Sequence, residues 1–242
     1  MRRIKVRVAY DGGEFYGWQV QPSLPTVQGL LEQVVGEIEG KAVEVAGSGR
    51  TDAGVHALAQ VAAFTLENPI PLTNLRRAIN RLLPPTVRIL SAEEVHPDFH
   101  PRFEAQAKTY EYRMLREEVC SPFEWPYVHH YPYPLEEDRM IRLAAVFTGS
   151  HDFSAFAAAD ESDTAGKSKV RTIFSSVLER EPGRLIYRVR GSGFLKHMVR
   201  NLVGTLLEAG KGNLAELETL PPKSGPTAPA KGLFLVEVEY GE

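Results

Sequence analysis

Residues 49–56 read Gly-Arg-Thr-Asp-Ala-Gly-Val-His, and they join a predicted strand over residues 41–46 to another over about residues 57–66. A loop between strands is a common place for a reacting side chain, and Asp52 puts one carboxylate there. We expect Arg50 to favour the ionised form of Asp52, because a nearby opposite charge stabilises a carboxylate. The alternative is an ordinary polar hairpin loop, since Gly, Ser, Thr and Asp are typical turn residues.

The elements around this loop follow the order strand, helix, strand, strand, helix, strand. Residues 4–10 alternate as a strand, and a helical apolar stripe then runs from an N-cap at Thr26 to a stop at Gly40. After the two strands that flank Asp52, a second helix is predicted over about residues 75–82 and is stopped by two prolines. A strand over residues 87–95 completes the first half of the chain.

The second half of the chain repeats this order. Periodicity there predicts strands over residues 110–116, 170–180, 184–190 and 233–240, with helices over residues 135–147 and 195–209. The repeat predicts an α+β fold made of two ferredoxin-like or RRM-like βαββαβ halves. We expect a first domain at residues 1–104, which carries the Asp52 loop, and a second domain at residues 105–242.

Composition is typical of an ordinary soluble enzyme. The chain has 242 residues, of which 43% are hydrophobic and 24% are charged. Its single cysteine, Cys120, cannot form an intramolecular disulfide, which favours a reducing compartment. The N-terminus lacks the apolar run of a signal peptide, and no later run is long enough to span a bilayer. We therefore expect a cytoplasmic protein that does not insert in a membrane, and the sequence has no visible metal cluster.

The net charge of −3 argues against a polyanionic partner, but the basic residues are clustered. Three clusters are formed by Arg76, Arg77, Arg81 and Arg88, by Lys167, Lys169 and Arg171, and by Arg184, Arg188 and Arg190. If the fold gathers these clusters, it leaves a positive face suited to nucleic acid. The alternative is that they are solvated surface charges.

Residues 49–56, followed by Gln60-Val61 and Phe64, closely resemble the signature of TruA-type tRNA pseudouridine synthases. Further segments resemble later blocks of that family in order: Tyr10 with Gly17-Trp18-Gln19, residues 99–103, Lys108-Thr109-Tyr110, residues 151–156, residues 194–204 and Gly232-Leu233. The resemblance covers essentially the whole chain. It implies that the sheets of the two halves combine and that the active site lies in the cleft between them.

The resemblance also implies three catalytic residues. Asp52 corresponds to the catalytic aspartate, Tyr110 to the tyrosine that lies against the target base, and Arg200 to the arginine that pairs with the aspartate. Stacking on an aromatic ring contributes about 1–3 kcal/mol per base. Spacing alone does not rank Tyr110 above Tyr112, and a surface arginine whose stem covers apolar residues is the alternative for Arg200. Gly204, one turn after Arg200, is expected to let another element approach closely.

The implied reaction is the isomerisation of uridine to pseudouridine in the anticodon stem-loop of tRNA, at positions 38, 39 and 40. It needs no cofactor and no metal, and the target nucleotide should be flipped out of its helix. Besides Tyr110, the candidates for substrate contact are Arg50, His56, Arg102 and Arg171, for which a structural role remains the alternative. The family suggests a homodimer in which one tRNA contacts both subunits, and DNA is not an expected partner.

Three other functions are compatible with parts of the pattern. A catalytically silent RNA-binding protein could use paired RRM-like units, but neither half has an RNP1-like run. A carboxylate hydrolase normally needs two carboxyl groups, and residues 49–56 contain only one. Phosphate binding by Gly47-Ser48-Gly49 lacks the Lys-Ser/Thr ending of a P-loop.

Overall fold

The computed structural model describes residues 1–159 and 168–241, which form two compact units. The first unit contains residues 1–106 and 234–242, and the second contains residues 107–233. Nearly all of the C-terminal strand therefore belongs to the first unit, because its residue contacts lie mainly there. Whether the chain has independently folding domains that meet at residues 104 and 105 stays a prediction. Lys167, a member of one basic cluster, lies outside the described residues.

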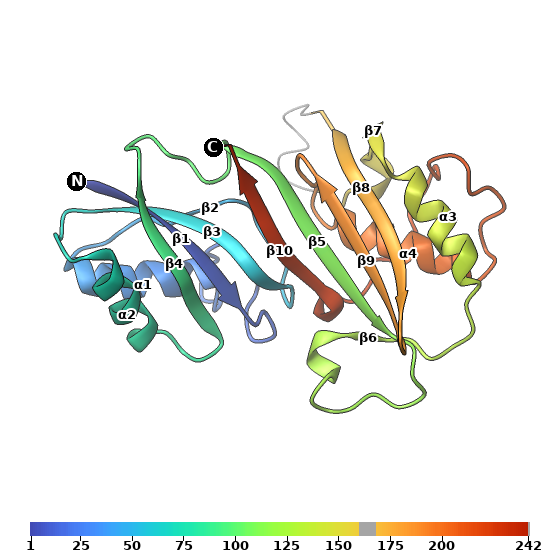
Figure 1. Cartoon of the computed structure of the whole chain (residues 1–242), viewed down its shortest axis with the longest axis horizontal. Helices are drawn as coiled ribbons and strands as arrows, with labels where there is room; N and C mark the ends of the chain where they lie inside the picture. Colours follow the sequence, from blue (N-terminus) through green and yellow to red (C-terminus); the bar gives the residue numbers. More distant parts are fainter. Residues whose placement is uncertain (160–167, 242) are drawn as a thin grey trace. The chain divides into compact units, whose positions relative to one another are not determined.

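The sheet of the first unit has the strand order β4-β1-β3-β10 (Figure 1). Its strands are β1 (Arg2–Tyr10), β2 (Ala46–Gly47), β3 (His56–Leu66), β4 (Val87–Val95) and β10 (Leu233–Tyr240). Strand β1 is antiparallel to both β3 and β4, whereas β10 is parallel to β3 and pairs Phe234 with His56. The short strand β2 also pairs with β3, at Ala63 and Ala62. The first half thus has the expected βαββαβ order.

Helix α1 (Val27–Glu39) begins and ends as the sequence predicts, whereas α2 (Leu72–Leu82) ends as predicted but begins three residues earlier, at Leu72. Helix α1 starts where the Thr26 hydroxyl accepts a hydrogen bond from the Gly29 N–H, and it ends at Gly40, whose φ is 79°. Helix α2 stops before the two prolines. The core between helices and sheet is built from Ile4, Val6, Val8, Leu31, Val35, Phe64, Leu66, Leu75 and Ile79. Burying each of these aliphatic or aromatic side chains contributes about 1.5–3 kcal/mol.

The prediction of a strand over residues 41–46 is wrong for most of that range, because only Ala46–Gly47 forms strand β2. Val45 is buried, as an inward strand residue would be, but its backbone is bonded to side chains of α1. Its N–H donates to Glu32 Oε1 at 3.2 Å, and its carbonyl accepts from Gln28 Nε2 at 3.1 Å. These helix side chains take the place of a neighbouring strand.

The sheet of the second unit has the order β5-β9-β8-β7 (Figure 1). Its strands are β5 (Ala105–Leu115), β6 (His129–His130), β7 (Gly149–Asp152), β8 (Val170–Glu181) and β9 (Arg184–Gly191). Strand β9 is antiparallel to β5 and β8, and β6 pairs in parallel with the end of β5. The sequence did not predict β6 and β7, since both are short and polar and have no apolar alternation.

Two helices complete the core of the second unit: α3 (Glu137–Val146) and α4 (Met198–Gly210). Helix α4 is buried on nearly all sides, and it begins three residues later than predicted because His197 has a φ of 60°. The expected close approach at Gly204 is confirmed: a Cβ there would lie 1.8 Å from the carbonyl oxygen of Pro226. Short 3-10 helices occur at Trp125–Tyr127, Ser154–Phe156 and Ala230–Gly232.

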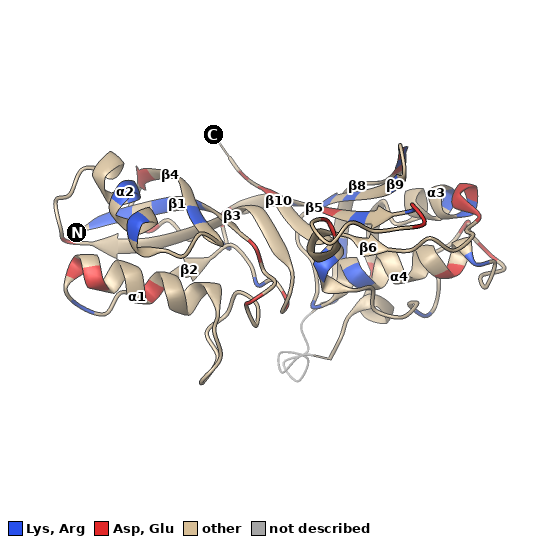
Figure 2. Cartoon of the chain, turned by 90° about the horizontal axis from the view of Figure 1, so that it is seen from below, with Lys and Arg blue, Asp and Glu red and all other residues tan. Residues whose placement is uncertain are grey.

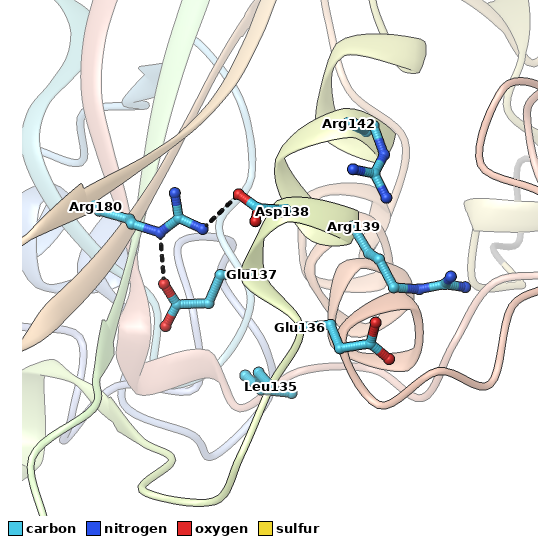
Figure 3. Close-up of a pocket in the computed structure, with 7 residues that line it drawn as sticks. All are labelled: Leu135, Glu136, Glu137, Asp138, Arg139, Arg142 and Arg180. Atoms are coloured by element: carbon cyan, nitrogen blue, oxygen red, sulfur yellow. Dashed lines mark hydrogen bonds and ion pairs between the residues drawn. The ribbon is translucent and has the colours of Figure 1, made fainter.

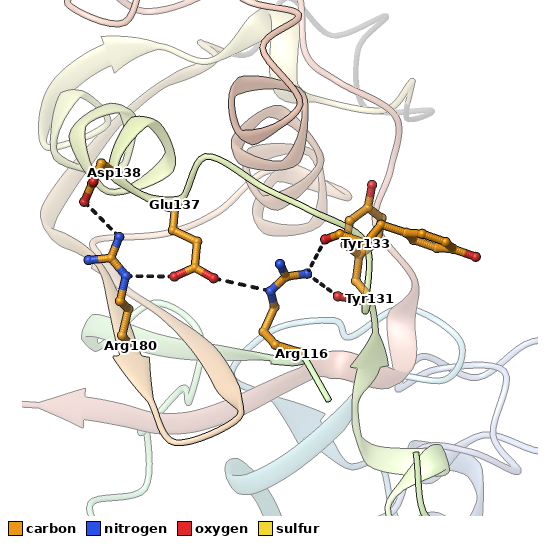
Figure 4. A network of polar contacts seen from close by, with 6 residues as sticks. All are labelled: Arg116, Tyr131, Tyr133, Glu137, Asp138 and Arg180. Atoms are coloured by element: carbon orange, nitrogen blue, oxygen red, sulfur yellow. Dashed lines mark hydrogen bonds and ion pairs between the residues drawn. The ribbon is translucent and has the colours of Figure 1, made fainter. Parts of the chain in front are cut away.

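An ion-pair network ties the segment after β5 to the start of α3 (Figure 4). Glu137 accepts from Arg180 Nε at 2.7 Å and from Arg116 Nε at 3.4 Å, and Arg180 also contacts Asp138 at 2.8 Å. The hydrogen bond from Arg180, with its positive charge, lowers the pKa of the Asp138 carboxyl. Arg116 further donates to the carbonyl oxygens of two tyrosines, Tyr131 and Tyr133.

Within the residues that the structure describes, no helix has the length and apolar character needed to cross a membrane.

Candidate active site

Asp52 lies in the loop between β2 and β3, where its side chain is half-buried and that of Arg50 is exposed. The loop turns tightly after Asp52, since its carbonyl accepts a hydrogen bond from the Val55 N–H at 3.1 Å. Gly54 permits this turn with a φ of 76°, and its N–H donates to the carbonyl of Phe15 at 3.3 Å. The segment between β1 and α1 therefore supports the loop from outside.

Gln60 anchors the start of the loop from strand β3. Its side chain is fully buried on the face of β3 that otherwise carries apolar residues. Gln60 Nε2 donates to the Gly49 carbonyl at 3.0 Å, while its Oε1 accepts from the Ser48 hydroxyl at 2.5 Å and from the Val61 N–H at 3.1 Å. A buried amide with its polar atoms bonded is a stable anchor for two loop residues.

His56, at the end of the loop, is also buried, with 1% of its surface exposed. Its Nδ1 lies 3.0 Å from the Gly12 N–H and 3.1 Å from Asp11 Oδ1, and its ring stacks on Phe234 at 4.7 Å. A Cβ on Gly12 would lie 2.0 Å from the Val55 carbonyl oxygen, so the two segments are in direct contact. This burial favours a structural role for His56 over contact with RNA.

Tyr110 lies in the middle of β5 and is 8% exposed. Its ring meets the edge of Phe194 at a centroid distance of 5.1 Å. Tyr112, two residues on and on the same face, is fully buried and its hydroxyl donates to the Pro229 carbonyl at 2.9 Å. That bond gives Tyr112 a structural role in the second unit.

Arg200 lies in the first turn of α4 and is half-buried. Its Nε donates to the Ala228 carbonyl at 2.8 Å, and the Ala228 N–H donates to the Arg200 carbonyl at 3.1 Å. The side chain is therefore directed along the segment that leads to β10, and it is not an unattached surface cation.

The two remaining predicted contacts are surface cations. Arg102 is exposed, and its guanidinium lies 5.9 Å from the centre of the Phe103 ring. Arg171, in β8, donates to the carbonyl oxygens of Ser168 and Val170 at 2.9 and 2.7 Å. They belong to the first and second units respectively.

The predicted residues thus fall into two groups. In the first unit, Arg50 and Asp52 lie in the loop between β2 and β3 and His56 lies at the start of β3; the second unit contains Tyr110 and Arg200. Sequence reasoning did not assign a role to the supports of the loop, namely Tyr10, Ser48, Thr51 and Gln60. Of these four residues, only Gln60 could have been noticed in the sequence. It is a polar residue on the apolar face of a strand, and a buried polar group needs hydrogen-bond partners.

A polar depression at the start of α3 contains none of these residues (Figure 3). Its volume is about 460 Å³, and it is lined by Leu135, Glu136, Glu137, Asp138, Arg139, Arg142 and Arg180. Its carboxylates Glu137 and Asp138 are already paired with Arg180. In the described ranges no group of three His, Cys, Asp or Glu side chains is arranged to hold a metal ion.

Comparisons with known proteins agree with the sequence resemblance. A family model described as tRNA pseudouridine synthase matches residues 7–104 and 143–241, which include Asp52 and Arg200 but not Tyr110. The tRNA pseudouridine synthase A of Solibacter usitatus (strain Ellin6076) is 73% identical over 240 residues, covering 99% of this chain and 100% of the relative. That of Brevibacillus brevis (strain 47 / JCM 6285 / NBRC 100599) is 42% identical over 247 residues, covering 99% and 100%.

A chain in the crystal structure of the archaeal box H/ACA sRNP Nop10-Cbf5 complex aligns with 84% of this chain and 43% of its own length. The identity is 13% and the TM-score 0.36, a likeness too low to bear on fold or function. The sequence relatives and the family model carry the assignment: this chain belongs to the tRNA pseudouridine synthases, of the TruA type.

Proposed function

We propose that this chain converts uridine to pseudouridine in the anticodon stem-loop of tRNA, with Asp52 as the catalytic carboxylate. The observation that carries the proposal is the position of Asp52: a half-buried carboxylate on a loop whose flanking residues are fixed by buried hydrogen bonds, in a chain of this family. Such preorganisation holds a reacting group in place before the substrate arrives.

The reaction is an isomerisation, and its atoms balance without an oxidant or reductant. The N1–C1′ bond of uridine breaks, the uracil turns while it stays bound, and C5 joins C1′. The hydrogen on C5 leaves as a proton, and N1 gains one. An anionic Asp52 serves this sequence as a nucleophile or as a base.

Arg200 and Tyr110, both in the second unit, are assigned to the proposed site because they correspond to the arginine and tyrosine of the family. By this correspondence, Arg200 is the cation that acts with Asp52; its side chain is half-buried, and its Nε donates to the Ala228 carbonyl. We assign Tyr110, by the same correspondence, to stacking on the target base, and Arg50 to contact with the RNA at the position of the flipped nucleotide.

Charge segregation within the first unit supports binding to RNA. Helix α2 carries Arg76, Arg77 and Arg81 and no acidic residue, whereas α1 carries Glu32, Glu37 and Glu39 and no basic one (Figure 2). Arg77 and Arg81 are exposed. We infer that these arginines, with Arg102 and Arg171, contact phosphates of the RNA. By family resemblance, we also propose that the chain acts in the cytoplasm and that two copies form the active dimer.

The test uses purified protein and unmodified tRNA labelled with tritium at C5 of uridine. Tritium should be released to water as pseudouridine forms, since C5 loses its hydrogen when it bonds to C1′. A matched tRNA with cytidine in place of the anticodon stem-loop uridines is the control and should release none. Equal release from both RNAs would contradict the anticodon-arm assignment, and no release from either would contradict the activity.

Binding should weaken as salt is raised, because contacts with phosphates release counterions. The logarithm of the association constant for tRNA should fall linearly with the logarithm of the salt concentration. An affinity that does not change with salt would argue against the assigned arginine contacts.

A further inference from the structure

The residue that precedes Asp52 is held by the side chain of a buried tyrosine. The hydroxyl of Tyr10, in β1, lies 2.8 Å from Oγ1 of Thr51. Both residues are buried, with exposed fractions of 4% and 7%. The backbone of Thr51 is fixed as well, because its carbonyl accepts a hydrogen bond from the Trp18 N–H at 3.1 Å. Thr51 is therefore anchored at two points, one residue before the carboxylate.

The Tyr10 hydroxyl remains neutral in this environment. Burial raises the pKa of Tyr10 to about 12, and hydrogen bonds with Thr51 and Gln60 act in the opposite direction. A neutral hydroxyl at this position adds no charge next to Asp52. Its contribution is geometric, since a buried hydroxyl–hydroxyl bond restricts the Thr51 side chain to one orientation.

The loop has little room to move as a body. A Cβ on Gly17, whose φ is +90°, would lie 2.5 Å from the Thr51 carbonyl oxygen and 3.2 Å from the carbonyl carbon of Asp52. Gln60 holds the Gly49 carbonyl on the other side. Besides this packing of the backbone, the Tyr10–Thr51 bond restrains the side chain of the residue that precedes Asp52.

We propose that the hydroxyl of Tyr10, acting through Thr51, is a positioning group for Asp52 in the isomerisation of uridine. This inference rests on the proposed function. Tyr10 does not contact the substrate, so it is a positioning residue and not a catalytic one. A small displacement of a reacting group lowers the rate of the chemical step, by up to about a hundredfold for 1 Å, and leaves binding nearly unchanged.

Tyr10→Phe removes the hydroxyl and keeps the ring. We expect its kcat to fall about tenfold or more, while KM and the Kd for tRNA change by less than about twofold. Tyr187→Phe is a matched control from the second unit, because Tyr187 is fully buried and its hydroxyl lies 2.8 Å from the Ser176 hydroxyl. The control should lose a similar amount of stability and keep its kcat.

Variants at Thr51 test the same bond from the other side and do not depend on the folding of Tyr10→Phe. Thr51→Val removes the hydroxyl and keeps the shape, so its kcat should fall as in Tyr10→Phe, whereas Thr51→Ser should retain most of the activity. The double variant Tyr10→Phe with Thr51→Val should be no slower than the slower single variant, since both remove one interaction.

An unchanged kcat in Tyr10→Phe, together with a loss of stability like that of Tyr187→Phe, would overturn the proposal and make the hydroxyl purely structural. Equal kcat values for Thr51→Val and Thr51→Ser, or multiplicative losses in the double variant, would also overturn it. A wild-type chain that forms no pseudouridine overturns the proposed function itself, an outcome seen before any variant is made.

Discussion

The loop that carries Asp52 and the helix that carries Arg200 are held in place by different interactions. The loop is held chiefly by the buried polar contacts of Tyr10 and Gln60, in addition to the close approach of the Gly17 backbone. The start of α4 depends on packing, since almost every residue of the helix is buried and Gly204 lies directly against Pro226. A hydrogen bond contributes only about 0.5–1.5 kcal/mol, whereas a closely packed helix resists displacement as a unit. Changes in the loop should therefore reduce catalysis, and changes in α4 should reduce stability.

The largest expected effect is that of Asp52→Asn, which removes the charge and keeps the shape. We expect kcat to fall at least about a thousandfold, because the reacting group itself is lost, while the affinity for tRNA and the melting temperature stay near those of the wild type. Tritium release and tRNA binding measure the two properties separately. Asp98→Asn, an exposed aspartate of the same unit, is the control. Normal turnover in Asp52→Asn would remove Asp52 from the mechanism.

Much of the fold on which this contrast rests follows from local pattern. Strand β4 was predicted at its observed bounds, and the capping signals at Thr26 and Gly40 marked the ends of α1, since both act within a few residues. The length of β2 could not be predicted, because the backbone of Val45 is bonded by side chains thirteen or more residues away in the chain. Periodicity carries no information about such partners.

In the candidate site, too, some features could be predicted from the sequence and others could not. Asp52, Tyr110 and Arg200 were assigned through the family resemblance, and composition alone would not have selected them. The contact between Tyr10 and Thr51 joins residues 41 positions apart, and it exists only because β1 and β3 are neighbours in the sheet. His56 was an open choice between an RNA contact and a structural residue, and only its burial between Asp11 and Phe234 favours one of them.

Arg200→Ala is expected to reduce both activity and stability, because it changes the candidate site and the support of α4 together. The rate should fall about a hundredfold, a typical loss when one charged donor is removed from an active site. The free energy of unfolding should also fall by about 1–2 kcal/mol, since the Ala228 carbonyl loses its partner Nε. Denaturant unfolding and single-turnover rates measure the two losses.

Arg142→Ala, an exposed arginine of α3, is the matched control for charge removal and should change neither quantity much. Arg200→Lys should restore part of the rate only if charge matters more than the geometry of the guanidinium. An Arg200→Ala variant with the rate and stability of the wild type would reject both roles of this residue.

A pair of glycine variants compares the two regions directly. Gly17→Ala places a methyl group 2.5 Å from the Thr51 carbonyl at a φ of +90°, so it should displace the Asp52 loop and lower kcat about tenfold. Gly204→Ala places one 1.8 Å from the Pro226 carbonyl, and it should lower the free energy of unfolding by about 1–3 kcal/mol. Its rate per folded molecule should stay within about threefold of the wild type.

An exchange of the two effects would contradict the proposed difference between the loop and α4. A Gly17→Ala protein with a normal kcat would mean that the loop tolerates displacement. A Gly204→Ala protein that is fully stable but slow would mean that α4, and not the loop, controls the geometry of the reaction. Melting curves and steady-state rates on the same preparations decide between these outcomes.

The smallest expected effect concerns His129, which differs from the bonded polar groups around Asp52. Within the described part of the chain, its Nδ1 is buried without a hydrogen-bond partner. Burial, with smaller contributions from the positive charges of Lys231, His130 and Lys211, lowers the pKa of His129 to about 4. The folded state thus resists protonation, whereas an unfolded histidine binds a proton below about pH 6.5.

Stability should therefore fall as the pH decreases from about 6.5 to about 4, because only the unfolded state gains a proton in that range. The partial exposure of the ring limits the loss to the order of 1 kcal/mol. Urea unfolding at several pH values should show this loss in the wild type and a smaller one in His129→Gln, with His96→Gln as the control at an exposed histidine. Identical pH profiles for the wild type and His129→Gln would contradict this prediction. They would mean that water or a shift of the ring gives Nδ1 a hydrogen-bond partner.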